Sequence, residues 1–158
     1  MKQRPTLLIV DRNSHVREYL KRELGCEGYH IHLAENSREL FQRINVEPKI
    51  DIIIIDPDLP DVEEKSLLGK LKSIQPRTPV VIHTFIADYL SPGGRLFEAV
   101  LVEKDGNSVE RLKHAIKGQL NLKRPASEHF PEAASDVGRR TKKREMPPFE
   151  DVTLDGQR

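Results

Sequence analysis

The sequence predicts an α/β protein built around a parallel β-sheet with helices on both faces. Short runs of aliphatic residues alternate along the chain with longer segments in which apolar residues recur every three or four positions. The first pattern is typical of strands buried on both faces, and the second is typical of amphipathic helices. Alternating strands and helices favour a parallel sheet, and right-handed crossovers restrict such a sheet to a few doubly wound forms.

Five aliphatic runs are the expected strands. The clearest of them, Ile52–Ile55, holds four consecutive isoleucines and leads directly into Asp56 and the turn Pro57–Pro60. A short, unbroken β-branched run that is bounded by turn residues is typical of a strand buried on both faces. The other four expected strands are Leu7–Val10, Ile31–Leu33, Val80–Ile82 and Val100–Val102.

Four segments have the apolar spacing of a helix, and a fifth is interrupted. Asn36 or Ser37 is expected to cap the second helix, and Gly25 and Gly28 lie where the first helix should end. A proline and two glycines interrupt Ala87–Glu98, so a loop and a short helix are expected there. The four periodic sets are Val16, Tyr19, Leu20 and Leu24; Leu40, Phe41 and Ile44; Leu67, Leu68, Leu71 and Ile74; and Val109, Leu112, Ala115, Ile116 and Leu120.

Length and composition favour one folded domain followed by a tail. Residues 1–121 carry the alternating pattern, whereas residues 122–158 hold four prolines, few aliphatic residues and the basic run 139–144, and are expected to be disordered. The formal net charge of +1 favours neither nucleic acid nor a membrane as a partner, apart from nucleic-acid contact by that basic run. The single cysteine, Cys26, excludes an intramolecular disulfide, and no apolar run near the start is long enough for a signal peptide or a membrane span. A cytoplasmic protein is therefore expected.

Polar residues of complementary chemistry follow four of the expected strands. Asp11 follows the first strand, Asp56 the third, Thr84 the fourth and Lys104 the fifth. In a sheet with the strand order 2-1-3-4-5, these strand ends meet at one edge, where ligands bind. Two carboxylates there can hold Mg²⁺, and an aspartate can be a nucleophile that forms an aspartyl phosphate. A lysine and a threonine hydroxyl can bind the phosphoryl oxygens.

These residues lie in the stretches LLIVDRNSHVREYLKREL, DIIIIDPDLPD, PVVIHT and AVLVEKDG, which resemble the receiver domain of two-component response regulators over roughly residues 5–120. The resemblance implies a flavodoxin-like (βα)5 fold and phosphotransfer from a histidine kinase or phosphotransfer protein. It implies that Asp56 is the phospho-acceptor, Asp11 an acidic-pocket residue, the Asp58 carbonyl a metal ligand, Thr84 the switch hydroxyl and Lys104 a phosphoryl contact. The chain is then expected to be a stand-alone signalling receiver, not an enzyme beyond its own phosphotransfer, that acts on an unknown downstream protein.

Four positions depart from the pattern of that family. The family usually has a second acid, often a Mg²⁺ ligand, where this chain has Arg12, which cannot bind a cation. Mg²⁺ is therefore expected to bind weakly, and three outcomes stay open: weak metal-dependent phosphorylation, stabilisation of the phosphoryl group by the guanidinium without metal, or no phosphorylation. Phe85 replaces a small residue, Leu101 takes the aromatic-switch position and Glu64 replaces a glycine, so restricted access and an altered output surface are expected.

Structural roles compete with these functional ones. Asp11 could cap the first helix, Thr84 could be an ordinary strand residue, and Arg12 could pair with a nearby acid. His83 is expected to be an inert strand residue, and the six histidines lack metal-ligand spacing. Two other functions are weighed: a pseudo-receiver that binds partners without phosphorylation, and a small α/β enzyme or flavin binder, for which a glycine-rich phosphate loop is missing.

Overall fold

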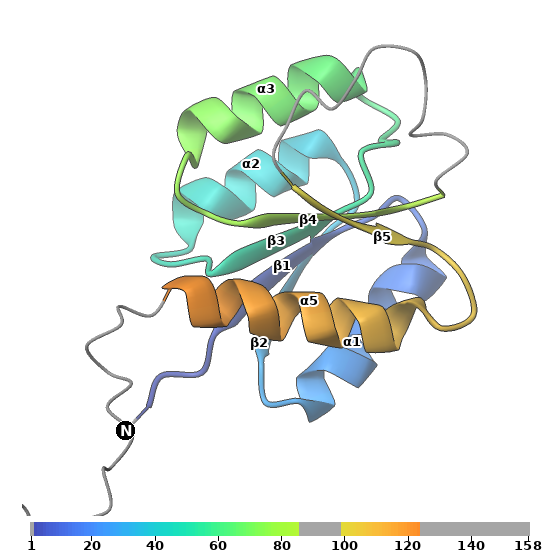
Figure 1. The fold of residues 1–158 in the computed structure, drawn as a ribbon. Helices are drawn as coiled ribbons and strands as arrows, with labels where there is room; N and C mark the ends of the chain where they lie inside the picture. Colours follow the sequence, from blue (N-terminus) through green and yellow to red (C-terminus); the bar gives the residue numbers. More distant parts are fainter. Residues whose placement is uncertain (1, 86–98, 124–158) are drawn as a thin grey trace, which may run out of the picture. The chain divides into compact units, whose positions relative to one another are not determined.

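A computed structural model of the chain describes residues 2–85 and 99–123 (Figure 1). Five parallel strands form one sheet in the order β2-β1-β3-β4-β5, which confirms the predicted doubly wound, flavodoxin-like fold. The strands are β1 (Thr6–Val10), β2 (His30–Ala34), β3 (Ile52–Ile55), β4 (Val80–Thr84) and β5 (Val100–Glu103). The helices are α1 (Ser14–Cys26), α2 (Ser37–Val46), α3 (Glu64–Ile74) and α5 (Ser108–Lys123).

Helices α2 and α3 cover one face of the sheet, and α1 and α5 cover the other (Figure 1). Successive residues of a strand point to opposite faces, so Leu8 and Val10 of β1 pack toward α2 and α3, whereas Leu7 and Ile9 pack toward α1 and α5. β3 lies between β1 and β4 and is buried along its whole length. This position explains its uninterrupted isoleucine run, since each such side chain contributes roughly 1.5–3 kcal/mol when fully buried.

Local side-chain chemistry sets several helix ends. Asn36 caps α2 as predicted, because its side-chain oxygen accepts a hydrogen bond from the Glu39 amide at 2.9 Å. Gly28 follows α1 with a φ of 89°, a conformation that glycine adopts without steric cost, whereas Gly25 lies inside the last turn of the helix. α5 continues to Lys123, two residues beyond the expected end of the folded domain.

Two sequence predictions lie outside the described residues. They are the loop and short helix expected at 87–98 and the disordered tail from residue 124 onward. Within residues 2–85 and 99–123, no helix is both long and apolar enough to cross a membrane.

The register of the central strands positions the predicted site. Val10 of β1 pairs with Ile55 of β3, so Asp11 and Asp56 leave the sheet side by side. The pairing extends one residue further, because the Asp56 amide donates to the Val10 carbonyl at 2.9 Å. On the other side of β4, the Lys104 amide donates to the Thr84 carbonyl at 2.9 Å. All four predicted residues therefore lie at the carboxyl edge of the sheet.

Candidate functional site

The predicted residues at the carboxyl ends of four strands form one polar cluster, in which Thr84 is the last residue of β4 and the other three directly follow a strand. The Lys104 ammonium lies 2.7 Å from Asp11 Oδ2 and 2.5 Å from Asp56 Oδ2. The Thr84 hydroxyl donates a hydrogen bond to Asp56 Oδ1 at 3.2 Å. Asp11, Asp56 and Thr84 are 2%, 7% and 3% exposed, so the cluster is largely shielded from water. The structure thus brings together every one of these predicted positions from four different strands.

The positive charge of Lys104 offsets the repulsion between the two adjacent buried carboxylates of Asp11 and Asp56. Burial alone would lower the pKa of the Lys104 ammonium, but hydrogen bonding and charge attraction from Asp11 and Asp56 outweigh burial and raise that pKa. Asp11 Oδ2 is buried and has no hydrogen bond of good geometry among the described residues, so it depends on its ion pair with Lys104. The lysine is therefore fixed as a positive charge beside the Asp56 carboxylate.

Backbone amides orient the two carboxylates. Asp56 Oδ1 accepts from the Asp58 amide at 3.0 Å, and Asp11 Oδ1 accepts from the Asn13 amide at 2.8 Å. Asn13, not Asp11, caps α1, because the Asn13 side chain accepts from the first amides of that helix. The competing role of Asp11 as a helix cap is therefore wrong, and its side chain is available to the cluster.

Arg12 lies at the mouth of the cluster and pairs with Asp58. Arg12 Nη2 is 3.2 Å from Asp58 Oδ2, and the two side chains are 59% and 62% exposed. The pair joins the loop that follows β1 to the loop that follows β3, one residue after Asp11 and two residues after Asp56. The nearby acid that could pair with Arg12 is therefore Asp58, whose own amide bonds to Asp56.

The residues present do not fit a tightly held divalent cation. Asp11 and Asp56 are the two buried carboxylates, and Lys104 already bridges them. The Asp58 carboxylate is engaged by the Arg12 guanidinium, a group that supplies no lone pair to a metal. Among the described residues, no group of three histidine, cysteine, aspartate or glutamate side chains is arranged to hold a metal ion. Two carboxylates and the Asp58 carbonyl are the oxygens left for Mg²⁺.

Three neighbours of the cluster were not assigned a role from the sequence. His83 is 3% exposed, its Nε2 has no hydrogen-bond partner among the described residues, and burial together with the nearby Lys104 charge lowers its pKa to about 4. Arg17 donates to the Asp11 carbonyl at 2.6 Å and pairs with Glu35. Burial and the negative charges of Asp56 and Asp58 raise the pKa of Glu64. His83 lies in β4 as predicted, and its lowered pKa keeps the buried ring neutral at neutral pH.

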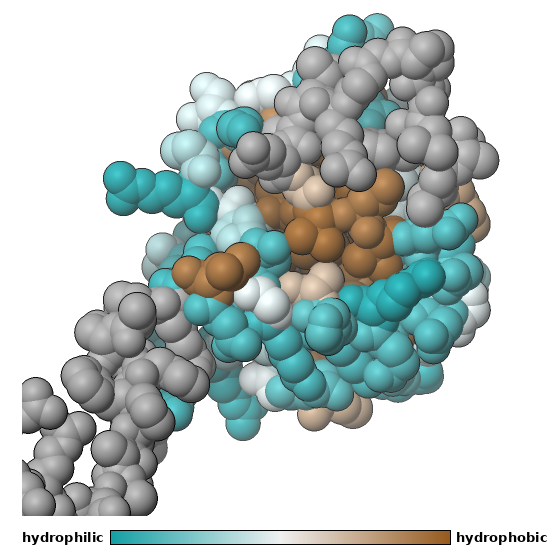
Figure 2. Space-filling view, in the orientation of Figure 1, coloured by the Kyte–Doolittle hydropathy of each residue, from teal (hydrophilic) through white to brown (hydrophobic). Residues whose placement is uncertain are grey.

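The departures at positions 85 and 101 have distinct surroundings. Phe85 is half exposed, and its ring centroid lies 5.6 Å from the Lys104 ammonium, so the ring lies over the cation of the cluster. Leu101 packs against the core on the α2 and α3 side and lines an open cavity of about 550 Å³ between β5 and α5. Figure 2 shows an apolar patch in the region of β5, and Val100, Leu101 and Val102 of this strand line the cavity.

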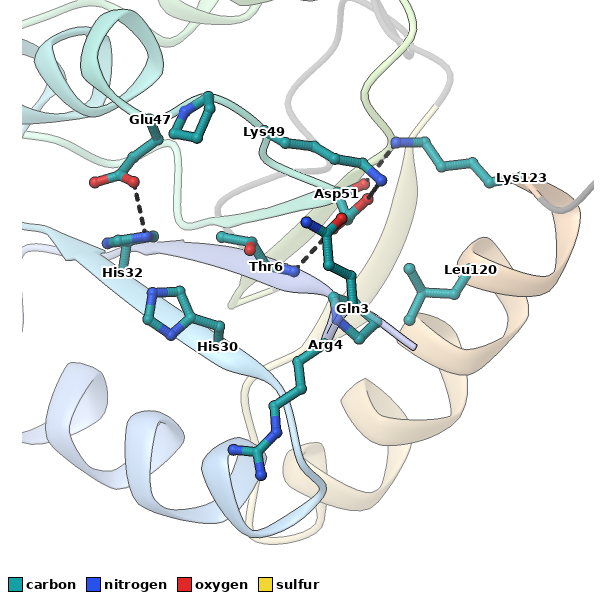
Figure 3. Close-up of a pocket in the computed structure, with 12 residues that line it drawn as sticks. Gln3, Arg4, Thr6, His30, His32, Glu47, Lys49, Asp51, Leu120 and Lys123 are labelled. Carbon is teal, nitrogen blue, oxygen red and sulfur yellow. Dashed lines mark hydrogen bonds and ion pairs between the residues drawn. The ribbon is translucent and has the colours of Figure 1, made fainter. Parts of the chain in front are cut away.

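A second cavity, of about 590 Å³, lies at the amino ends of β1, β2 and β3, at the opposite end of these strands from the polar cluster (Figure 3). Asp51, immediately before β3, accepts a hydrogen bond from the Thr6 amide at 2.8 Å, and its carbonyl accepts from the Lys123 ammonium at 2.9 Å. On the same side, His32 Nε2 is 3.1 Å from Glu47 Oε2. These contacts join the end of α5 and the end of α2 to the sheet, so we interpret this cavity as structural.

Comparisons with known proteins agree with the geometry. The family model described as "Response regulator receiver domain" matches residues 7–92. The virulence transcriptional regulatory protein PhoP of Salmonella typhimurium is 35% identical over 78 residues, which are 49% of this chain and 34% of PhoP. The regulatory protein AtoC of Escherichia coli is 29% identical over 83 residues, which are 52% of this chain and 18% of AtoC. The aligned part therefore spans about a third or less of these curated relatives.

Solved structures with the same fold extend further along the chain. The response regulator TrrA of Thermotoga maritima, solved in complex with Mg²⁺-BeF, is 27% identical with a TM-score of 0.65 and covers 73% of this chain and 98% of its own. A receiver domain protein of Clostridium thermocellum has a TM-score of 0.66 at 24% identity and covers 75% of this chain and 96% of its own. The second likeness supports the fold alone.

Proposed function

The chain belongs to the response regulator receiver domain family of two-component signalling, and on this premise we propose that Asp56 accepts a phosphoryl group from a histidine kinase or a phosphotransfer protein. The observation that supports this proposal most directly is the buried Asp56 carboxylate, held between the Lys104 ammonium and the Thr84 hydroxyl at the end of β3. A buried acid is costly unless it is paired, and the partners that Asp56 has are a cation and a hydroxyl, both able to bind phosphoryl oxygens.

The arrangement suits in-line transfer of a phosphoryl group. An Asp56 oxygen attacks phosphorus, the new O–P bond forms as the P–N bond of a phosphohistidine breaks, and the imidazole leaves with the electron pair and takes a proton from water. Lys104 offsets the charge on the phosphoryl oxygens, and the Thr84 hydroxyl, which now donates to Asp56, can donate to one of those oxygens instead. The added charge then biases the surface that a downstream protein recognises.

Magnesium binding and cellular location form the finer part of this proposal. We propose that Mg²⁺ binds weakly, through Asp11, Asp56 and the Asp58 carbonyl, because Arg12 stands where a further acid would be needed. We further propose a cytoplasmic receiver that signals through protein contacts and has no enzyme activity beyond its phosphotransfer.

Phosphorylation with a small donor tests the central claim. The chain is incubated with acetyl phosphate, with and without Mg²⁺, and its intact mass is measured. We expect the mass of one phosphoryl group to be gained by the wild type and by Asp58→Ala, which removes an exposed neighbouring acid, but not by Asp56→Ala. A wild type that gains no mass with acetyl phosphate or any kinase, or an Asp56→Ala variant that still does, would contradict the proposal.

A phosphorylation-independent binding module is the second candidate. The Arg12–Asp58 pair at the mouth and the Phe85 ring over Lys104 favour it, because both occupy the approach to Asp56. It predicts that Asp56→Asn leaves partner binding unchanged when a partner is captured and its affinity measured. A large loss of affinity in Asp56→Asn would exclude this alternative.

A further inference from the structure

Arg12 places a second cation beside the phospho-acceptor. It directly follows Asp11, and its guanidinium contacts the carboxylate of Asp58 at 3.2 Å. The Asp58 amide in turn donates to Asp56 Oδ1 at 3.0 Å. One residue, bonded to both, therefore separates the guanidinium from the carboxylate that would be phosphorylated.

The contact that holds Arg12 is easily exchanged. Both partners are more than half exposed, and an ion pair in such a position contributes little to stability. A phosphoryl group carries more charge than a carboxylate, and its oxygens match the planar fork of a guanidinium, which binds them with two parallel hydrogen bonds. When Arg12 leaves Asp58, water can solvate the exposed Asp58 carboxylate, so the exchange leaves no buried charge without a partner.

The charges of the cluster show why a second cation is needed. The Lys104 ammonium is shared by two buried carboxylates, so it is not free to neutralise an incoming group on its own. Arg17, the next cation along the chain, is committed to the Asp11 carbonyl and to Glu35. Glu64 adds negative charge, as the effect of Asp56 and Asp58 on its pKa indicates. Arg12 differs from Arg17 in that its own side chain is 59% exposed, whereas that of Arg17 is 13% exposed.

We propose that Arg12 binds the phosphoryl oxygens during transfer and in the phosphorylated protein, and that transfer to Asp56 therefore does not require a divalent metal ion. This inference rests on the proposed function, since it concerns the same site. With acetyl phosphate as donor, the Asp56 O–P bond forms while the P–O bond to acetate breaks, and acetate leaves with the electron pair. The step is balanced without a metal, a proton or a further reactant.

The test measures labelling by acetyl phosphate in EDTA and in Mg²⁺, for the wild type and for matched arginine variants. In EDTA we expect the wild type to be labelled at nearly its rate in Mg²⁺, and Arg12→Ala to be slowed by at least about tenfold, as on loss of a charged donor to transition-state oxygens. Arg12→Lys should be intermediate, because it keeps the charge but loses the fork. Arg22→Ala removes another exposed, ion-paired arginine and should match the wild type.

A binding measurement supplies a readout that does not depend on turnover. Mg²⁺ alone is titrated into the wild type and into Arg12→Asp, and amide chemical shifts near Asp56 are followed. We expect saturable binding at millimolar or lower Mg²⁺ only in Arg12→Asp, whose labelling should also become dependent on Mg²⁺. Equal Mg²⁺ affinity in the two proteins would overturn the inference.

The outcomes separate this inference from the proposed function. If EDTA abolishes labelling of the wild type, or if Arg12→Ala in EDTA is labelled as fast as the wild type, Arg12 does not take the place of a metal, and Asp56 remains the phospho-acceptor. If the wild type is labelled in no condition, the proposed function fails, and this inference fails with it.

Discussion

Removing the Lys104 ammonium should destabilise the fold strongly, because two buried carboxylates depend on it. In Lys104→Met the side chain keeps much of its apolar contact, but Asp11 and Asp56 lose their shared cation. Since both oxygens contact one nitrogen, they lie no more than about 5 Å apart, and at an effective dielectric constant of about 20 their repulsion is roughly 3 kcal/mol. Loss of one partner of a buried ion pair typically costs about 3–5 kcal/mol, and we expect a loss in this range at pH 7.

Urea unfolding followed by circular dichroism measures this loss. Lys117→Met is the control, since Lys117 is an exposed lysine 3.3 Å from Glu27 and its removal should change the unfolding free energy by less than about 1 kcal/mol. Adding Asp11→Asn to Lys104→Met should recover much of the stability, because one of the two facing charges is then absent. A loss below about 1 kcal/mol, or the same loss with Asp11 already neutral, would refute the reasoning.

Three further substitutions test other parts of the structure. The pKa of His83 is lowered to about 4 in the folded protein, whereas an unfolded histidine has a pKa of about 6.5. Between these two pH values the unfolded chain binds a proton that the folded protein does not bind. Stability should therefore be full above about pH 6.5 and fall by about 3 kcal/mol as the pH drops to 4. His83→Val should remove this dependence, and an unchanged pH profile of unfolding would argue against it. Asp51→Ala leaves the Thr6 amide without its acceptor and should lower the unfolding free energy by about 1–3 kcal/mol, whereas a change within experimental error would show that water replaces the carboxylate. Asn36→Ala removes the cap of α2 and should cost about 1 kcal/mol in thermal unfolding, with Asn36→Asp retaining most of the stability.

Aliphatic patterning was sufficient to predict the sheet. The run Ile52–Ile55 identifies a strand buried on both faces, and the alternation of such runs with helical periodicity predicts a doubly wound parallel sheet, which the structure confirms. Asn36 was recognised as a cap because its chemistry acts within three residues of chain. Predictions of this kind succeed because the interactions responsible for them are local or depend on hydrophobic burial alone.

The positions of the cluster could also be predicted, because they follow from topology. Once β1 and β3 are neighbours, residues that leave their carboxyl ends must meet, and Asp11 and Asp56 do so although 45 positions separate them. The resemblance to receiver domains points to the same residues, and their chemical roles stay predictions until phosphorylation is measured.

Only the three-dimensional structure shows which residues surround each charged side chain. The sequence left Arg12 with several outcomes, and the structure pairs it with Asp58 across the mouth of the cluster. Nothing in the sequence distinguishes His83 from other strand residues, yet burial beside Lys104 lowers its pKa to about 4.

The amino-acid order by itself determined the layers of the fold and the edge of the sheet at which the acids gather, since apolar periodicity and crossover handedness act through chain connectivity. Only the tertiary structure decided that one ammonium bridges two carboxylates and that a guanidinium stands outside them. The physical reason is that electrostatic partnership and desolvation depend on distances of a few ångströms between side chains from different strands and loops, and the sequence alone does not set those distances.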